Sequence, residues 1–130
     1  MDSVELLKKL QVKVGARLWL INVPRPIAEA ITAGAEIETV KDGEPCDGVI
    51  AFAANPTEVV TMAAQVLKVV PRDGLLWFAY RKGAAAKTSG LSRDTGWEPL
   101  RDAGWDTVRS ISIDESWTGL RFRPVDLIKR

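Results

Sequence analysis

The side chains best suited to chemistry in this sequence gather in one basic segment, residues 81–93. The segment carries four cations, no acidic residue, and glycines interleaved with hydroxyl groups. Cations and hydroxyl donors on a glycine-containing loop are the groups that hold a phosphate or a carboxylate. We therefore predict an anion site formed by Lys82, Lys87, Thr88, Ser89 and Arg93. The alternative is a solvated loop whose lysines only keep the protein soluble.

A second group of cations is predicted in a C-terminal hairpin. If residues 114–116 form its loop, Arg109 faces Arg121, and Arg123 lies on the same side because cross-strand partners share a face. Leu120, Phe122 and Val108 are then expected on the other side. Three neighbouring arginines need acids, an anion or a partner, so we add Arg121 and Arg123 to the predicted anion site. The internal acids that are the alternative partners are Asp94, Asp102 and Asp114.

The composition excludes several kinds of catalysis. The 130-residue chain has no histidine and a single cysteine, Cys46. This excludes Ser-His-Asp catalysis, histidine acid–base catalysis, histidine-ligated zinc, an internal disulfide and a cysteine-only metal site. Cys46 has acidic sequence neighbours and is expected to be unreactive. We expect no metal and no cofactor, and we leave the enzyme question open with binding favoured over catalysis.

The overall charge and hydropathy bear on partners and location. With 18 basic and 17 acidic residues the net charge is +1, which argues against a nucleic-acid-binding protein. No apolar run approaches the roughly 18 residues of a membrane span, and the first residues lack the apolar stretch of a signal peptide. We expect a cytoplasmic protein that does not enter a membrane. Its partner would be an anionic small molecule or a protein, and homo-oligomerisation is left open.

The elements that would position these residues alternate between strand and helix. Apolar runs separated by turn residues predict buried strands of an α/β sheet. Asn55, Pro56 and Glu58 mark a helix start, since asparagine caps, proline suits the first turn and glutamate can reach back. The expected strands are residues 16–23, 35–40, 48–53, 75–80, 106–113 and 117–123. The other expected helices lie near residues 3–10, 27–34 and 97–103.

The order of these elements resembles a known fold. CDGVIAFA, a helix ending at VVPRDG, LLWFAY, a helix around Trp97 and a hairpin over residues 108–123 resemble the closing half of the class I, S-adenosylmethionine-dependent methyltransferase fold. The opening half is similar but one strand–helix unit shorter. KTSGLSRDTGW and ISIDESWTGLRFRP also resemble small bacterial domains of this fold, for which no activity is established.

The resemblance implies one three-layer, Rossmann-like α/β sandwich over residues 1–130. Together with right-handed crossovers it implies a six-stranded, mostly parallel sheet of order 2-1-3-4-6-5 with a C-terminal antiparallel hairpin. Ligands of such sheets bind beyond the carboxyl ends of the strands. In this chain that crevice is expected near residues 23–26 and 53–55 and beside the basic segment.

The segment where this family binds its cofactor departs from the family pattern. The family places a glycine-rich turn after the first strand, because glycine lets backbone amides approach S-adenosylmethionine. This chain has NVPRP at residues 22–26, and its two prolines remove two amide donors. Glu38 is the nearest match to the ribose-binding acid. Asn55-Pro56 matches the start of the aminomethyltransferase motif, for which the helix cap is the alternative.

We therefore predict a non-catalytic domain without a cofactor that binds an anionic small molecule or an acidic partner through residues 81–93. Two alternatives stay open. One is a divergent S-adenosylmethionine-dependent methyltransferase. The other is a structural or oligomerisation module whose interface is the tryptophan-rich end, Trp97, Trp105 and Trp117, although core packing is the other use of these rings.

Overall fold

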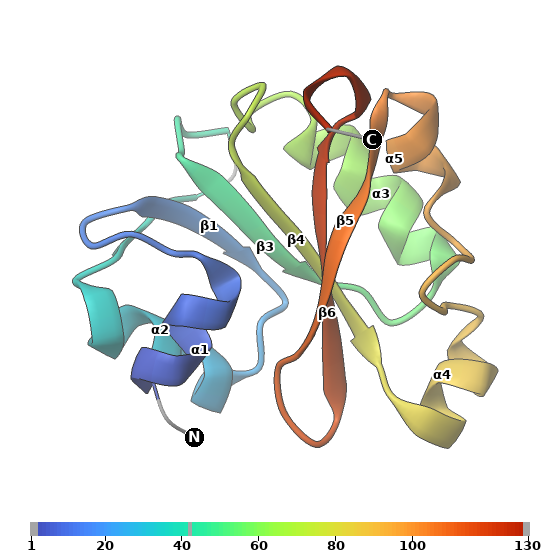
Figure 1. The fold of residues 1–130 in the computed structure, drawn as a ribbon, viewed down its shortest axis with the longest axis horizontal. Coiled ribbons are helices and arrows are strands. Elements are labelled where there is room, and N and C mark those ends of the chain that lie inside the picture. The colour runs from blue at the N-terminus through green and yellow to red at the C-terminus, as the bar shows by residue number, and fades with distance from the viewer. Residues whose placement is uncertain (1–2, 42, 129–130) are drawn as a thin grey trace.

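A computed structural model describes residues 3–41 and 43–128, and one sheet runs through them. Its strands are β1 (Arg17–Ile21), β2 (Glu38–Thr39), β3 (Gly48–Phe52), β4 (Leu75–Arg81), β5 (Trp105–Ser112) and β6 (Trp117–Pro124). They lie in the order β2-β1-β3-β4-β6-β5 (Figure 1). β1 to β4 are parallel, whereas β6 is antiparallel to both β4 and β5. The predicted strand order and the antiparallel hairpin are confirmed.

Helices cover both faces of this sheet. They are α1 (Ser3–Leu10), α2 (Arg25–Ala35), α3 (Pro56–Val66), α4 (Gly83–Ser89), α5 (Glu98–Asp102) and the 3-10 helix η1 (Val125–Leu127). α1 and α2 pack on one face, and α3 and α5 pack on the other (Figure 1). This arrangement confirms the three-layer Rossmann-like sandwich. No helix among the described residues is long and apolar enough to cross a lipid bilayer.

Strand β3 contributes side chains to the hydrophobic cores on both faces of the sheet. All of its residues are buried. Val49 and Ala51 pack toward α3 and α5, whereas Ile50 and Phe52 pack toward α1 and α2, because successive side chains of a strand point to opposite faces. A strand covered on both faces has no polar side, which is why an uninterrupted apolar run predicted it.

Trp77 ties the end of α1 to the centre of the sheet. Its side chain is fully buried, and its indole Nε1 donates a hydrogen bond to the carbonyl oxygen of Leu10 at 2.9 Å. Leu10 ends α1, where the last carbonyls have no partner within the helix. The next residue, Gln11, turns the chain with a left-handed φ of 60°. The bond from Trp77 therefore also fixes where Gln11 lies.

The start of α3 has the capping geometry that the sequence predicts. The Asn55 side-chain oxygen accepts the Glu58 amide at 2.9 Å, and the Glu58 carboxylate accepts the Ala54 amide at 2.9 Å. Pro56 occupies the first turn, where its missing N–H costs nothing. These bonds confirm the helix-cap interpretation of Asn55-Pro56.

The C-terminal hairpin has the predicted register and one irregularity. Arg109 pairs with Arg121, and the Ile113 amide donates to the Trp117 carbonyl at 3.0 Å, as a three-residue loop requires. The register shifts at Val108, which has no partner in the β5–β6 pairing. The prediction that Val108 shares a side with Leu120 and Phe122 is wrong, because this bulge leaves Val108 40% exposed beside the arginines, whereas Leu120 and Phe122 are fully buried.

The tryptophans of the last third are used inside the fold. Trp97 is fully buried, and Trp105 is buried in the same core. Trp117 packs edge-on against Phe52, with ring centroids 4.7 Å apart, and the Arg81 guanidinium lies 4.4 Å from its ring centroid. Trp97 and Trp105 are therefore not available as the interface that the oligomerisation hypothesis assigned to them.

Candidate functional site

The turn after β1 is built by prolines rather than glycines. Asn22 has a left-handed φ of 54°, and Pro24 precedes the first residue of α2. The Pro24 carbonyl accepts the amides of Ile27 at 3.0 Å and Ala28 at 2.9 Å. Pro24 and Pro26 have no N–H to offer. Much of the amide surface that the methyltransferase resemblance implies at this turn is therefore missing or already used.

Glu38 lies near the amino ends of the strands, whereas a ribose-binding acid would lie at their carboxyl ends. β2 pairs Glu38 with Arg17 and Thr39 with Leu18, so it runs beside only the first two residues of β1. Arg17 Nε lies 3.4 Å from Glu38 Oε2. Glu38 is therefore an ion-pair partner at the amino ends of the strands, and its predicted match to the family's acid is wrong.

The basic segment leaves the carboxyl end of β4 and docks on the C-terminal hairpin. The Lys82 amide donates to the Ser116 carbonyl at 2.9 Å, and Lys82 Nζ donates to Ser112 Oγ. Arg81 covers the ring of Trp117. These contacts hold the start of the segment against the hairpin, and the choice between an anion site and a solvated loop stays open for the residues that follow.

The other predicted ligands of the basic segment lie on α4 and the loop after it. Thr88 Oγ1 donates to a carbonyl one turn earlier at 3.5 Å, and Ser89 Oγ accepts the Leu91 amide at 3.1 Å. Lys87 and Arg93 are exposed. The two hydroxyls thus make local bonds, and anion binding by Lys82, Lys87 and Arg93 stays a prediction.

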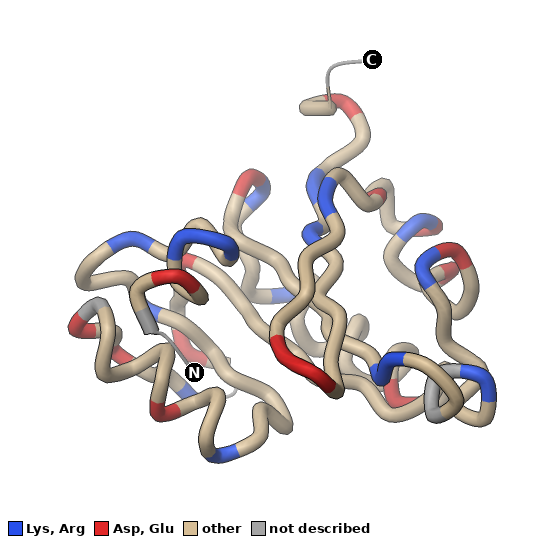
Figure 2. The backbone as a smooth tube through the Cα atoms, turned by 60° about the horizontal axis from the view of Figure 1, so that its bottom comes forward, with Lys and Arg blue, Asp and Glu red and all other residues tan. Residues whose placement is uncertain are grey.

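The structure divides the predicted anion ligands into two groups. Arg121 pairs with Trp77 in β4, whereas Lys82 follows the last residue of that strand. Because β6 runs antiparallel to β4, Arg121 and Arg123 lie toward the amino end of β4. Figure 2 shows the same separation of charge along the hairpin: its turn is acidic (red), and basic residues (blue) lie on its strands toward the other end. The hairpin arginines are therefore not part of one site with the basic segment.

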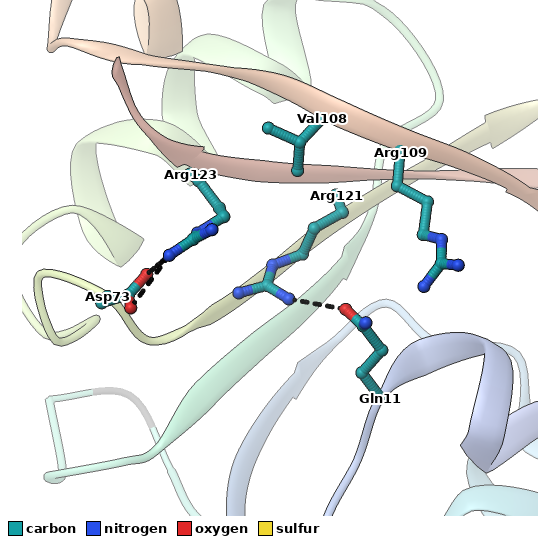
Figure 3. Close-up of a pocket in the computed structure, with 6 residues that line it drawn as sticks. All are labelled: Gln11, Asp73, Val108, Arg109, Arg121 and Arg123. Carbon is teal, nitrogen blue, oxygen red and sulfur yellow. Dashed lines mark hydrogen bonds and ion pairs between the residues drawn. The ribbon is translucent and has the colours of Figure 1, made fainter. Parts of the chain in front are cut away.

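The hairpin arginines line an open hollow of about 420 Å³, which we call the arginine hollow (Figure 3). Arg109 comes from β5, Arg121 and Arg123 from β6, and all three project from the face that α1 and α2 partly cover. The remaining lining residues are Gln11 after α1, Asp73 before β4, and the bulged Val108.

The three arginines differ in their partners. Arg123 donates from Nε and Nη2 to the two oxygens of Asp73, each at 3.1 Å. Arg121 donates from Nη1 to Gln11 Oε1 at 3.0 Å and from Nη2 to the Gly74 carbonyl at 3.5 Å. Its Nε is buried and has no hydrogen-bond partner among the described residues. Arg109 is exposed, and its guanidinium makes no hydrogen bond or ion pair to any residue that the structure describes.

The electrostatics of the hollow favour an anion. Burial lowers the pKa of Arg121, and the like charge of Arg123 lowers it further, while Asp73 acts in the opposite direction. Among the lining residues, three arginines face one carboxylate, and Arg123 already pairs with it. Two positive charges, those of Arg109 and Arg121, are left without an acidic partner in the hollow.

A second cavity adjoins the arginine hollow. It measures about 540 Å³ and shares Gln11, Asp73 and Arg121 with the first. Its other lining residues come from the α1–β1 loop and the amino ends of three strands: Lys13, Val14, Gly15, Ala16, Leu18, Asp47, Gly74 and Leu75. We call it the adjoining hollow.

Sequence reasoning missed two residues of the site, Gln11 and Asp73. The acids proposed for the arginines were wrong: Arg123 pairs with Asp73, while the Asp114 carboxylate accepts amides of its own turn at 2.7 and 2.9 Å. Asp73 sits in the turn before β4, so the antiparallel direction of β6 could have indicated it. Gln11 gave no signal, because its place depends on how α1 crosses the sheet.

Metal binding finds no support in the described part of the chain. No three acidic or cysteine side chains gather there in a way that could hold an ion. The hollow presents cations instead.

Known proteins resemble this chain in fold rather than in sequence. No family model and no curated protein matches the sequence. NodS, an N-methyltransferase from Bradyrhizobium japonicum, superposes with a TM-score of 0.57 at 17% identity, over 94% of this chain and 93% of NodS. Aeropyrum pernix fibrillarin with bound S-adenosyl-L-methionine gives 0.56 at 11% identity, over 93% and 76% of the two chains.

A third structure gives the same result. The 1,6-didemethyltoxoflavin-N1-methyltransferase of Burkholderia thailandensis, solved with S-adenosylhomocysteine, superposes with a TM-score of 0.58 at 15% identity. The match covers 96% of this chain and 77% of that enzyme. These likenesses show that the chain has the class I S-adenosylmethionine-dependent methyltransferase-like fold.

Proposed function

We propose that this methyltransferase-fold domain binds a small anionic ligand in the arginine hollow. The observation that carries the proposal is the pair Arg109 and Arg121, whose charges have no acidic partner in an open hollow. A half-buried guanidinium with an unpaired donor costs free energy. An oxyanion would offset that cost, because guanidinium groups bind carboxylates and phosphates with paired, charge-assisted hydrogen bonds.

Thermal unfolding with added inorganic phosphate or citrate tests the proposal. A ligand at 100 times its dissociation constant adds about 2.7 kcal/mol, which raises the midpoint by on the order of 10 °C in a domain of this size. Arg109→Gln is expected to abolish the shift. Arg25→Gln is the control, since it removes the same charge from a side chain that is 90% exposed and that pairs with Glu29 in the first turn of α2, beyond the carboxyl end of β1. An equal shift in Arg109→Gln and the wild type would contradict the proposal.

Methyl transfer from S-adenosylmethionine is the second candidate function. It is supported by the comparisons, in which two of the similar structures hold S-adenosylmethionine or its demethylated product. The residues at the carboxyl ends of the strands do not fit that cofactor well. Pro24 and Pro26 have no N–H to donate, and Glu38 lies at the amino ends of the strands. We therefore derive no methyl-transfer step for this chain.

The two candidates are separable with one further ligand. If S-adenosylhomocysteine raises the unfolding midpoint equally in the wild type and in Arg109→Gln, the methyltransferase hypothesis gains support. If it raises neither, that hypothesis loses its main expectation. Inorganic phosphate on the same two proteins reports on the arginine hollow independently.

The basic segment is the other place where an anion could bind, as the sequence predicts. Changing Lys82, Lys87 and Arg93 together to alanine is expected to alter the free energy of unfolding by less than about 1 kcal/mol, since these are surface changes. If the triple variant loses the phosphate shift and Arg109→Gln keeps it, the basic segment is the site. The reverse result assigns the anion to the arginine hollow.

Two predictions about the setting of the protein remain predictions from the sequence. One is its cytoplasmic location, and the other is association with an acidic partner or a second copy. Light scattering tests self-association, and a strict monomer at high protein concentration would contradict the oligomerisation module.

A further inference from the structure

We infer that the ligand of the arginine hollow carries an oxyanion head on an elongated, uncharged body. The inference rests on the proposed function and names the class of ligand. The head would bind Arg109 and Arg121, and the body would lie in the adjoining hollow.

Arg121 stands where the two hollows meet. It lines both, as do Gln11 and Asp73, whereas Arg109 lines only the first. A carboxylate or phosphate placed between Arg109 and Arg121 would therefore have the adjoining hollow directly on its Arg121 side. Arg123 is already held by both oxygens of Asp73, so the head is matched by the other two arginines.

The adjoining hollow offers apolar surface to the rest of the ligand. Val14 lines it and is 75% exposed, so it presents apolar surface to the hollow. Ala16 and Leu75 also line this hollow and are only partly buried. A hydrocarbon or aromatic body would cover these groups and leave water.

Asp47 places a negative charge in the adjoining hollow, where the end of the ligand body would lie. Its carboxylate lines the adjoining hollow and accepts the Arg17 amide at 2.8 Å, which holds it in place. A second anionic group placed beside Asp47 would be repelled by this fixed charge, whereas Lys13, which lines the same hollow, carries the opposite charge. A body that ends beside Asp47 is therefore expected to end in a neutral group, and an acid at that position is disfavoured.

A matched set of simple probes tests this inference by NMR titration, which detects weak binding. Acetate and inorganic phosphate are heads alone, hexanoate and hexyl phosphate add the body, hexanol is a body alone, and hexanedioate has two acidic ends. Four extra methylenes, half-buried, are worth roughly a factor of ten in affinity. We expect hexanoate to bind about tenfold tighter than acetate, hexyl phosphate, which adds six carbons, to gain more than that over inorganic phosphate, and hexanol not to bind. Comparison of the two heads distinguishes a carboxylate ligand from a phosphate ligand.

Two variants assign the body and its far end. Val14→Gln is expected to reduce the advantage of hexanoate over acetate, while Val60→Gln, at an exposed valine on α3, leaves it unchanged. Asp47→Asn keeps an oxygen acceptor for Arg17 and is expected to strengthen hexanedioate binding severalfold relative to hexanoate. No gain for hexanedioate would overturn the assignment of the far end.

The failures of this inference and of the proposed function look different. If acetate and hexanoate bind equally, and both are lost in Arg109→Gln, the anion site stands and the elongated body is wrong. If no anion binds, or if hexanol binds as tightly as hexanoate, the proposed function itself is wrong.

Discussion

Replacing Arg121 with methionine is expected to leave the free energy of unfolding unchanged or to raise it by up to about 1 kcal/mol. The loss is the hydrogen bond to Gln11 at 3.0 Å and the longer one to the Gly74 carbonyl at 3.5 Å, together worth about 1 kcal/mol. The gain is removal of a buried Nε that has no hydrogen-bond partner in the described part of the chain, and of a guanidinium whose pKa is lowered by burial and by the charge of Arg123. Methionine keeps an unbranched apolar stem in the same place.

Arg123→Met is the matched variant, on the same strand and the same face. It breaks both bonds to Asp73 and is expected to lower the free energy of unfolding by about 1 kcal/mol, the upper range for a partly exposed ion pair. Urea unfolding followed by tryptophan fluorescence measures both variants without added anion. If Arg121→Met costs as much as Arg123→Met or more, Arg121 is a structural residue, and the view that it is held ready for a ligand at some cost in stability is refuted.

Three further predictions concern the scaffold. Asn55→Ala should lower the free energy of unfolding by about 1 kcal/mol through loss of the α3 cap, whereas Asn55→Asp should keep it; equal urea midpoints for all three proteins would show that the cap contributes nothing. Gly48→Ala should cost about 2 kcal/mol or more, because the new Cβ would lie 2.6 Å from Leu75 Cβ and 2.7 Å from its carbonyl oxygen; an unchanged thermal midpoint would mean that β3 and β4 separate easily. Burial raises the pKa of the Cys46 thiol, so the contribution of the protonated thiol to the free energy of unfolding is complete below the ordinary thiol pKa of about 8.5 and declines above it. A disulfide reagent should react slowly with Cys46 until urea is added. Rapid labelling of the native protein would contradict this burial.

The fold was predictable because local signals agreed with one another. The apolar run of β3, the Asn55 cap of α3 and the three-residue hairpin loop each fix local geometry, and right-handed crossovers then leave few sheet orders. The pairing of Arg109 with Arg121 followed from loop length alone, since register in a hairpin is set by its turn.

The failures share a physical cause: each depends on where an element lies relative to its neighbours. Glu38 alternates like a strand residue, yet β2 is so short that it stays at the amino edge. Val108 could not be recognised as a bulge, because one extra residue leaves the composition of a strand unchanged. The prediction of one anion site with the basic segment and Arg121 did not take strand direction into account. Because β6 is antiparallel to β4, the end of β6 lies beside the start of β4, whereas the basic segment follows the end of β4.

The bulge at Val108 allows the arginine hollow to change size through the length of β5. Every pairing on either side of it continues without a gap, so removing Val108 alone would convert β5 into a regular strand and keep Arg109 opposite Arg121. Val108 belongs to neither core, so such a deletion would leave both cores in place. It would remove an apolar wall from the arginine hollow and leave the three arginines, so the size of the hollow can be changed by one residue of strand length without altering its charges.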